Sequence, residues 1–207
     1  MKIFESHHLF NYPWEQVSAA NWKKYPNEMS TQVVGVDILR REVDPVSKIL
    51  RTERLITCEQ SIPNWLSFIV GGLKRSYVRE VSEVDPINKS VVMRSMNLTM
   101  NSLLQVYEVV TYTPDPSAPT ARTKFTQEAQ ITAYASIKKL CNKVEEWGID
   151  RFDFNAKRGK IGFESVLKNV SENWESVKGA VMEEIEVKVG VLDEVTEKVR
   201  HGVFKFD

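Results

Sequence analysis

Apolar residues recur at every second position along most of this chain, and this period changes once, near residue 136. A two-residue period is typical of β-strands, whose side chains point alternately to the two faces of a sheet. About seven such segments precede the change, separated by turn signals: residues 2–11, 33–43, 50–58, 77–84, 90–100, 104–113 and 121–134. Consecutive strands joined by short turns predict an antiparallel meander.

A helical period begins near residue 136 and predicts one long helix that ends near Trp174, loosened at Gly148, Gly159 and Gly162. Since an antiparallel sheet has one face to bury, this helix is the element available to cover it. The predicted fold class is therefore α+β. A curved sheet closing over one helix leaves a space that can hold an elongated apolar ligand. Periodicity alone leaves open whether that interior is hollow or filled.

The length of 207 residues is that of one domain with an appendage. We expect the domain to cover residues 1–174. Residues 175–207 alternate apolar and acidic positions and contain no aromatic residue before Phe204. This pattern predicts an amphipathic or partly disordered C-terminal tail.

Charge and cysteine content argue against several classes of function. Lys plus Arg and Asp plus Glu number 28 each, so no global field favours nucleic acid. The two cysteines, Cys58 and Cys141, form neither a CxxC pair nor a disulfide framework. His7, His8 and His201 belong to no metal or catalytic motif, and GxSxG, HExxH and phosphate loops are missing from the sequence. We expect no enzymatic activity, metal or cofactor.

One uncharged apolar insert, SIPNWLSFIVGG at residues 61–72, follows a predicted strand. A transmembrane helix needs about 20 apolar residues, so neither this insert nor any other segment is long enough to cross a bilayer. The N-terminus has no signal-peptide or transit-peptide pattern. We therefore expect a soluble chain with peripheral membrane contact at most. From its residues alone, the insert is best interpreted as a short core helix.

Several segments, in order across residues 1–174, resemble the PRELI-like family of mitochondrial lipid-transfer proteins. They include VVGVDILRREVDP, RTERLIT, YVREVSEVDP, MRSMNLT and VYEVVTYTP. Two longer strings, NYPWEQVSAANWKKYPNE and TQEAQITAYASIKKLCNK, are most similar to the fungal phosphatidylserine-transfer branch, which is related to slowmo. The resemblance implies a START-like fold, in which an antiparallel sheet wraps around a long C-terminal helix with a lipid cavity between them.

The resemblance also implies a location and partners. The family works in the mitochondrial intermembrane space, where its members pair with a small helical protein of the twin Cys-x9-Cys class. They carry phospholipid from the outer to the inner membrane, and in this branch the implied cargo is phosphatidylserine. Two alternatives remain open: a phosphatidic acid carrier of the same family, and a membrane- or protein-interaction module that transfers nothing.

By the same resemblance, residues 61–72 form an Ω-loop lid over the cavity mouth. A lid covers acyl chains when it is closed and meets a bilayer when it is open, and apolar side chains suit both states. Hinge positions absorb changes in backbone angle, so Pro63, Gly71 and Gly72 are the hinge candidates. The residues expected to contact lipid or membrane are Trp65, Leu66, Phe68 and Ile69.

Basic residues are the first candidates for the headgroup site, because a phosphate needs cations or amide donors. The resemblance places basic residues of the phosphatidic-acid branch at the positions of Lys24, Lys143 and Arg151, which this chain keeps. At two further basic positions of that branch this chain has Cys58 and Ser61. The loss of two cations from the rim favours a headgroup that carries its own ammonium.

Polar residues on the strands are the second group of candidates: Asn97, Asn101 and Glu128. A buried polar group must find a partner, and either a headgroup or another side chain of the chain can serve. For any single lysine, a solvated surface position is the commoner alternative. Asp37 and Arg54 are a candidate structural pair between neighbouring strands.

Overall fold

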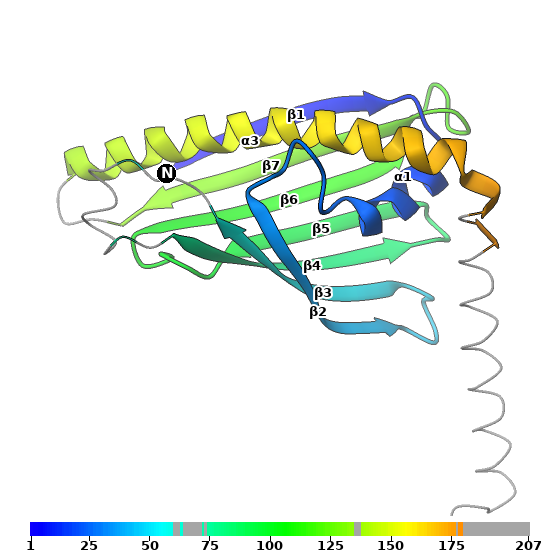
Figure 1. Cartoon of the computed structure of the whole chain (residues 1–207), viewed down its shortest axis with the longest axis horizontal. Helices are drawn as coiled ribbons and strands as arrows, with labels where there is room; N and C mark the ends of the chain where they lie inside the picture. Colours follow the sequence, from blue (N-terminus) through cyan, green and yellow to red (C-terminus); the bar gives the residue numbers. More distant parts are fainter. Residues whose placement is uncertain (60–62, 64–71, 73, 135–137, 177, 180–207) are drawn as a thin grey trace, which may run out of the picture. The chain divides into compact units, whose positions relative to one another are not determined.

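The computed structural model describes residues 1–59, 63, 72, 74–134, 138–176 and 178–179. Within these residues, one sheet of seven strands is accompanied by helices α1 (Trp14–Ala20) and α3 (Lys138–Glu172) and the short 3-10 helix η1 (Asn21–Lys23) (Figure 1). The strands are β1 (Lys2–Phe10), β2 (Val33–Val43), β3 (Leu50–Glu59), β4 (Arg75–Asp85), β5 (Ser90–Asn97), β6 (Leu104–Pro114) and β7 (Thr123–Ala133). The α+β, START-like architecture predicted from the sequence is confirmed.

The sheet is antiparallel throughout, in the order β1-β7-β6-β5-β4-β3-β2. Strands β2 to β7 form the expected meander. Strand β1 departs from it, because it pairs with β7 at the far edge, from Lys2 opposite Ile131 to Phe10 opposite Thr123. The intervening segment, with α1 and η1, therefore connects opposite edges of the sheet.

Helix α3 runs along one face of the sheet (Figure 1). Its rings pack on those of β1: Phe152 lies 5.0 Å from Phe4 and Phe163 lies 5.4 Å from Phe10, between ring centroids. A second cluster joins Val144 of α3 to buried residues of β6 and β7, namely Leu104, Ile131 and Ala133. These contacts lie within a compact unit that covers Met1–Lys168.

The glycines of α3 do not loosen it, so that part of the sequence prediction is wrong. The helix is continuous, and two of its glycines allow close packing instead. A Cβ at Gly148 would lie 3.1 Å from Ile131 Cγ2, and one at Gly162 would lie 2.3 Å from Asn27 Oδ1. The missing side chains let the sheet and the segment after η1 approach the helix.

Asn169–Asp207 form a second unit, into which α3 continues as far as Glu172. Residues 180–207 lie outside the described part of the chain, so the expected character of the tail stays a prediction. In the part of the chain that the structure describes, no helix has the length and apolar character needed to cross a membrane.

The alternation of buried and exposed residues in β7 shows which side chains face α3. Thr123, Phe125, Gln127 and Ala129 are buried, whereas the exposed Glu128 lies between two of them on the opposite face. Strand β6 follows the same rule. Its inward set includes Glu108, Val110 and Tyr112, which places one carboxylate among apolar side chains.

Candidate ligand-binding cavity

A cavity of about 230 Å³ lies between the inner face of the sheet and α3. Much of its wall is aromatic and aliphatic: Phe10, Val110, Tyr112, Phe125, Phe152 and Phe163. The rings form one packed group, with Tyr112 and Phe125 centroids 5.2 Å apart and Tyr112 and Phe163 centroids 6.0 Å apart. The interior left open by periodicity is therefore hollow at this position.

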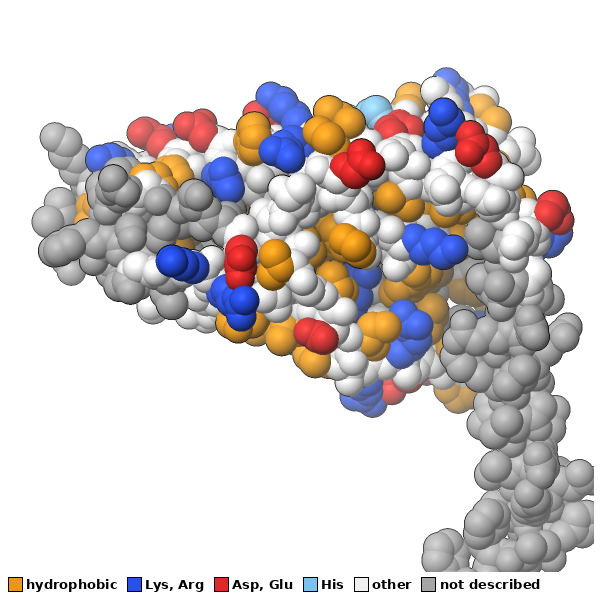
Figure 2. Space-filling model, viewed as in Figure 1, with side chains coloured by type: hydrophobic (Ala, Val, Ile, Leu, Met, Phe, Trp, Pro, Cys, Tyr) orange, Lys and Arg blue, Asp and Glu red, His pale blue; other side chains and the backbone are white. Residues whose placement is uncertain are grey.

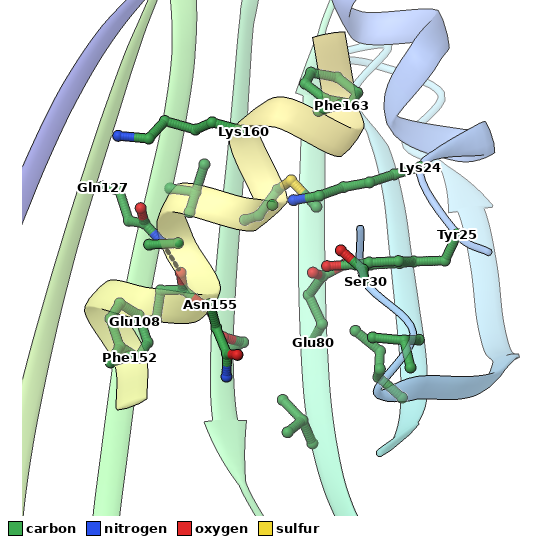
Figure 3. A pocket seen from close by; sticks show the side chains of 18 of the residues that line it. Lys24, Tyr25, Ser30, Glu80, Glu108, Gln127, Phe152, Asn155, Lys160 and Phe163 are labelled. Atoms are coloured by element: carbon green, nitrogen blue, oxygen red, sulfur yellow. Dashed lines mark hydrogen bonds between the residues drawn. The ribbon is translucent and has the colours of Figure 1, made fainter. Parts of the chain in front are cut away.

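Lys24 enters this cavity from the segment that follows η1 (Figure 3). Its Nζ lies 5.4 Å from the ring centroid of Tyr25 and 5.7 Å from that of Phe163. Among the described residues, no side chain gives this ammonium a hydrogen bond or an ion pair. The cavity thus contains a half-buried cation with room for an anionic group of a ligand.

Burial acts to lower the pKa of Lys24, but nearby electrostatic fields outweigh it and raise the pKa above its ordinary value. Those fields come from Tyr25, Tyr112, Glu108 and Glu80. The ammonium is therefore charged at neutral pH, although several aromatic and aliphatic side chains line the cavity around it.

Local packing and hydrogen bonds hold Lys24 in place. Helix α1, which leads into η1, is anchored by the buried side chains of Trp14 and Val17. After η1, the side chain of Asn27 donates to the Lys24 carbonyl at 2.6 Å. The Oδ1 atom of Asn27 accepts from the backbone N–H of Ser30 at 2.8 Å, which closes the turn beneath the lysine.

A row of polar side chains crosses the inner face of the sheet opposite Lys24. Arg54 is in register with Glu80, Glu80 with Ser95, and Ser95 with Glu108. Side chains directly opposite on neighbouring strands lie close enough to interact. Arg54 Nε donates to Glu80 Oε1 at 2.9 Å, and Ser95 Oγ donates to Glu108 Oε2 at 2.8 Å.

Gln127 completes the row from β7. Its Nε2 donates to Glu108 Oε1 at 2.6 Å, the hydrogen bond drawn in Figure 3. The two carboxylates of the row differ in whether a positive charge balances them. Glu80 is ion-paired with Arg54, whereas the hydrogen bonds to Glu108 come from a neutral amide and a neutral hydroxyl.

Two further lining residues are neutral at physiological pH. Burial raises the pKa of Tyr112 to about 12 and raises the pKa of the Cys58 thiol above its ordinary value. Among the described residues, no three His, Cys, Asp or Glu side chains are grouped as a metal site. The chemistry available here is non-covalent: the ammonium groups of Lys24 and Lys160, the carboxylates of Glu80 and Glu108, neutral hydrogen-bond donors, and an aromatic wall.

The structure places the predicted headgroup residues in different environments. Lys24 and Cys58 line the cavity. Lys143 is exposed on α3, and Arg151 lies with its guanidinium 5.9 Å from the ring centroid of Phe154; neither belongs to the cavity lining. Ser61 lies outside the described residues.

The polar strand candidates Asn97, Asn101 and Glu128 also lie outside the lining. Asn97 donates to the Leu104 carbonyl at 2.7 Å and accepts from the Val106 N–H at 2.7 Å, so its side chain links the ends of β5 and β6. Asn101 is exposed in the turn between these strands. Glu128 is exposed because it occupies an outward position of β7.

Most of the predicted lid falls outside the described residues: Trp65, Leu66, Phe68, Ile69 and Gly71. Of its hinge candidates, Pro63 is half-buried and Gly72 is exposed. Gly72 has a φ of +73°, a left-handed conformation that glycine adopts without strain. The role of this segment as a lid stays a prediction.

Sequence reasoning missed Glu108 and Gln127, although a signal for both was present. Each lies at an alternate position of an otherwise apolar strand face, Glu108 beside Val110 and Gln127 between Phe125 and Ala129. A polar residue in the apolar phase of a half-buried strand is a candidate for a cavity.

The predicted pair of Asp37 and Arg54 is wrong, because the β2–β3 register sets Asp37 opposite Leu55. Arg54 points inward instead and pairs with Glu80 on the other side of β3. Its guanidinium also lies 5.5 Å from the ring centroid of Trp22, so the segment around η1 packs on this end of the polar row.

Comparison with known proteins gives close relatives over nearly the whole chain. A profile of the PRELI-like family matches residues 15–174. "Protein UPS2, mitochondrial" of Saccharomyces cerevisiae is 53% identical over 209 residues, covering 96% of this chain and 91% of the yeast protein. "UPS-like protein C36.10" of Schizosaccharomyces pombe is 49% identical over 171 residues, covering 83% of this chain and 91% of that protein.

Solved structures share the fold at low sequence identity. The crystal structure of TTHA0849 from Thermus thermophilus superposes with a TM-score of 0.54 at 14% identity, covering 82% of this chain and 99% of that one. At this identity the likeness concerns the architecture alone.

Proposed function

The chain belongs to the PRELI-like family, and from that premise we propose that it is a mitochondrial phospholipid-transfer protein. Its cargo is phosphatidylserine, which it carries through the intermembrane space from the outer to the inner membrane. The transfer involves no covalent step. The protein instead lowers the barrier to lipid extraction by shielding part of the lipid from water.

One observation carries this proposal: a charged lysine stands in an aromatic cavity without an anionic partner among the described residues. A phosphate group of a lipid supplies the missing partner through charge-assisted hydrogen bonds. The same cavity offers Phe10, Phe152 and Phe163 to the apolar part of the lipid. An amphipathic ligand matches both features, whereas a free anion would leave the aromatic wall unused.

The size of the cavity indicates which part of the lipid it receives. Its volume of about 230 Å³ is below the roughly 300–1,000 Å³ of pockets that enclose drug-sized ligands. We therefore assign it to the headgroup and the glycerol region. The acyl chains then extend toward the mouth, where the family resemblance places the segment 61–72.

The charge of the lining favours a phosphodiester over phosphatidic acid. A phosphate monoester carries nearly two negative charges at neutral pH, whereas the phosphodiester of phosphatidylserine carries one. Glu108, which has no ion pair among the described residues, lines the same cavity as Lys24 and would repel a second negative charge on the phosphate. Cys58, which takes the place of a rim cation, contributes a neutral thiol.

The small helical twin Cys-x9-Cys protein is the proposed partner. The edge strand β2 supports a protein partner because its apolar side chains Val34, Ile38, Leu39 and Val43 are exposed. Exposed edge strands with apolar side chains are prone to association unless they are covered. Apolar side chains also lie at the surface among charged ones on the face drawn in Figure 2.

A vesicle assay tests the proposed function. Donor vesicles contain phosphatidylcholine and fluorescent phosphatidylserine with a quencher, and acceptor vesicles contain phosphatidylcholine alone. We expect the purified chain to raise the transfer rate in proportion to its concentration. If the chain binds the vesicles and leaves the rate at that of the protein-free sample, it is an interaction module and the proposal is wrong. Replacing the probe with fluorescent phosphatidic acid tests the alternative cargo. If phosphatidic acid is the cargo, it is transferred at least as fast as phosphatidylserine.

A further inference from the structure

We propose that Glu108, Gln127 and Ser95 form a subsite that binds the primary ammonium of the lipid headgroup. This inference rests on the proposed function, because it names the part of the cargo that this site recognises. The subsite lies in the same cavity as Lys24 but on the sheet side of it, on strands β5, β6 and β7 (Figure 3).

The hydrogen bonds of Glu108 leave capacity for a ligand. Its Oε1 accepts from Gln127 and its Oε2 accepts from Ser95, one described donor for each oxygen. A carboxylate has about four acceptor positions, so its two oxygens can each accept one more hydrogen bond. The existing bonds fix the carboxylate within the cavity wall without neutralising its charge.

Gln127 supplies an independent observation that points to a ligand. The side chain is 7% exposed, and its Oε1 has no hydrogen-bond partner among the described residues. Because Nε2 must donate to the Glu108 carboxylate, the amide cannot rotate to exchange its two ends. The oxygen is therefore held as a buried acceptor, and such acceptors in native proteins normally have a partner.

A primary ammonium matches this set of acceptors. It carries one positive charge and three N–H donors, which suits a carboxylate and an amide oxygen side by side. A quaternary ammonium such as choline has no N–H and would leave Gln127 Oε1 without a hydrogen bond. The polar headgroup of phosphatidylserine also has a phosphate, for which Lys24 is available across the cavity.

The surrounding charges favour a headgroup that carries an ammonium beside its negative groups over a headgroup with negative groups alone. Glu80 is neutralised by Arg54, while Lys160, a second basic residue of the lining, donates to the uncharged hydroxyl of Ser6 at 2.8 Å. Lys24 and Glu108 interact electrostatically, but no ion pair joins these two described residues. A ligand with a phosphate and an ammonium gives each of these two side chains a partner of opposite charge.

The test compares two lipids with the same net charge. Phosphatidylserine and phosphatidylglycerol are both phosphodiesters with one net negative charge, but only phosphatidylserine has an ammonium. Glu108→Gln keeps the shape of the side chain and can still bond Ser95 and Gln127, so it removes little except the charge. We expect it to slow phosphatidylserine transfer by about tenfold or more and to leave phosphatidylglycerol transfer within about twofold of the wild type.

Glu5→Gln is the matched control, because it is the same substitution at an exposed position of β1. Gln127→Met is the second variant. It replaces the amide, whose oxygen has no hydrogen-bond partner among the described residues, by a side chain of similar length, and we expect the same selective loss for phosphatidylserine. Phosphatidylglycerol transfer reports whether each variant is folded and active.

Two results would overturn the inference while leaving the proposed function intact. In the first, both variants slow the two lipids equally, which would make the cluster a structural element. In the second, neither variant changes the ratio of the two rates. If the wild type accelerates transfer of neither lipid, the proposed function itself fails, and the inference fails with it.

Discussion

Replacing Lys24 by methionine should slow phospholipid transfer without unfolding the protein. Methionine has a similar length and remains compatible with the rings of Tyr25 and Phe163, near which the ammonium lies. The substitution removes the charge-assisted contact to phosphate, which is worth about 1.5–3 kcal/mol. The transfer rate, or the affinity for the phospholipid, should therefore fall roughly 10- to 150-fold.

The stability effect of this change should be small, because two contributions oppose each other. Removing the ammonium ends the cost of its burial but also ends its attraction to Glu80 and Glu108. We expect a net change of about 1 kcal/mol, or a melting temperature within about 4 °C of the wild type for a domain of this size.

Lys23→Met provides the matched control, since Lys23 is the adjacent lysine and is exposed at the end of η1. The assay is vesicle transfer of phosphatidylserine and of phosphatidylglycerol. Both have a phosphodiester, so Lys24→Met should slow both, in contrast to Glu108→Gln. The reasoning is refuted if Lys24→Met transfers both lipids as fast as Lys23→Met.

Three further predictions concern the stability of the fold. Gly162→Ala should destabilise the protein by about 1–3 kcal/mol, because its Cβ would lie 2.3 Å from Asn27 Oδ1. Gly159→Ala, whose Cβ would have no atom within 4 Å, should stabilise the protein by about 0.5–1 kcal/mol. Equal effects of the two variants on the free energy of unfolding in urea would contradict this. Arg54→Met should lower the free energy of unfolding by about 3–5 kcal/mol, because it leaves Glu80 buried without its partner. The double change Arg54→Met with Glu80→Met should lower it much less. A single variant as stable as the double variant would refute this prediction. Burial raises the pKa of Tyr112 from 10.0 to about 12, so the stability that this phenol contributes is present below pH 10 and is lost as the pH rises to about 12. Unfolding at pH 9 and pH 11.5 should show a loss of about 2 kcal/mol that is absent in Tyr112→Phe, and equal losses in both proteins would contradict the assignment.

Much of the fold follows from local patterns in the sequence. The two-residue period identified the strands because each has one face on the core, and the change to a helical period located α3. The pairing of β1 with β7 was not predictable in this way. It depends on packing between Phe4 and Phe152 and between Phe10 and Phe163, which lie about 150 residues apart in sequence, and no local signal encodes such contacts.

The site was predicted less completely than the fold. Lys24 was identified by family resemblance, since nothing in its immediate sequence distinguishes it from the exposed Lys23. Glu128 was selected on β7, although its strand position directs it outward and the neighbouring Gln127 inward. Arg54 was assigned to the wrong neighbour, because the register sets Ile38 opposite Arg54 and Asp37 opposite Leu55, and an alternation pattern does not fix which residues of two strands face one another.

The most direct test of the account is to identify the lipid that the protein holds. Native mass spectrometry of the purified chain, followed by release and analysis of the bound lipid, measures both stoichiometry and headgroup. We predict one phospholipid per chain, with a primary ammonium headgroup that is phosphatidylserine in preference to other lipids of the source membrane. A chain that binds no lipid, or that retains phosphatidylglycerol or phosphatidic acid as readily, would contradict the assignment of Lys24 to the phosphate and of Glu108 to the ammonium of the headgroup.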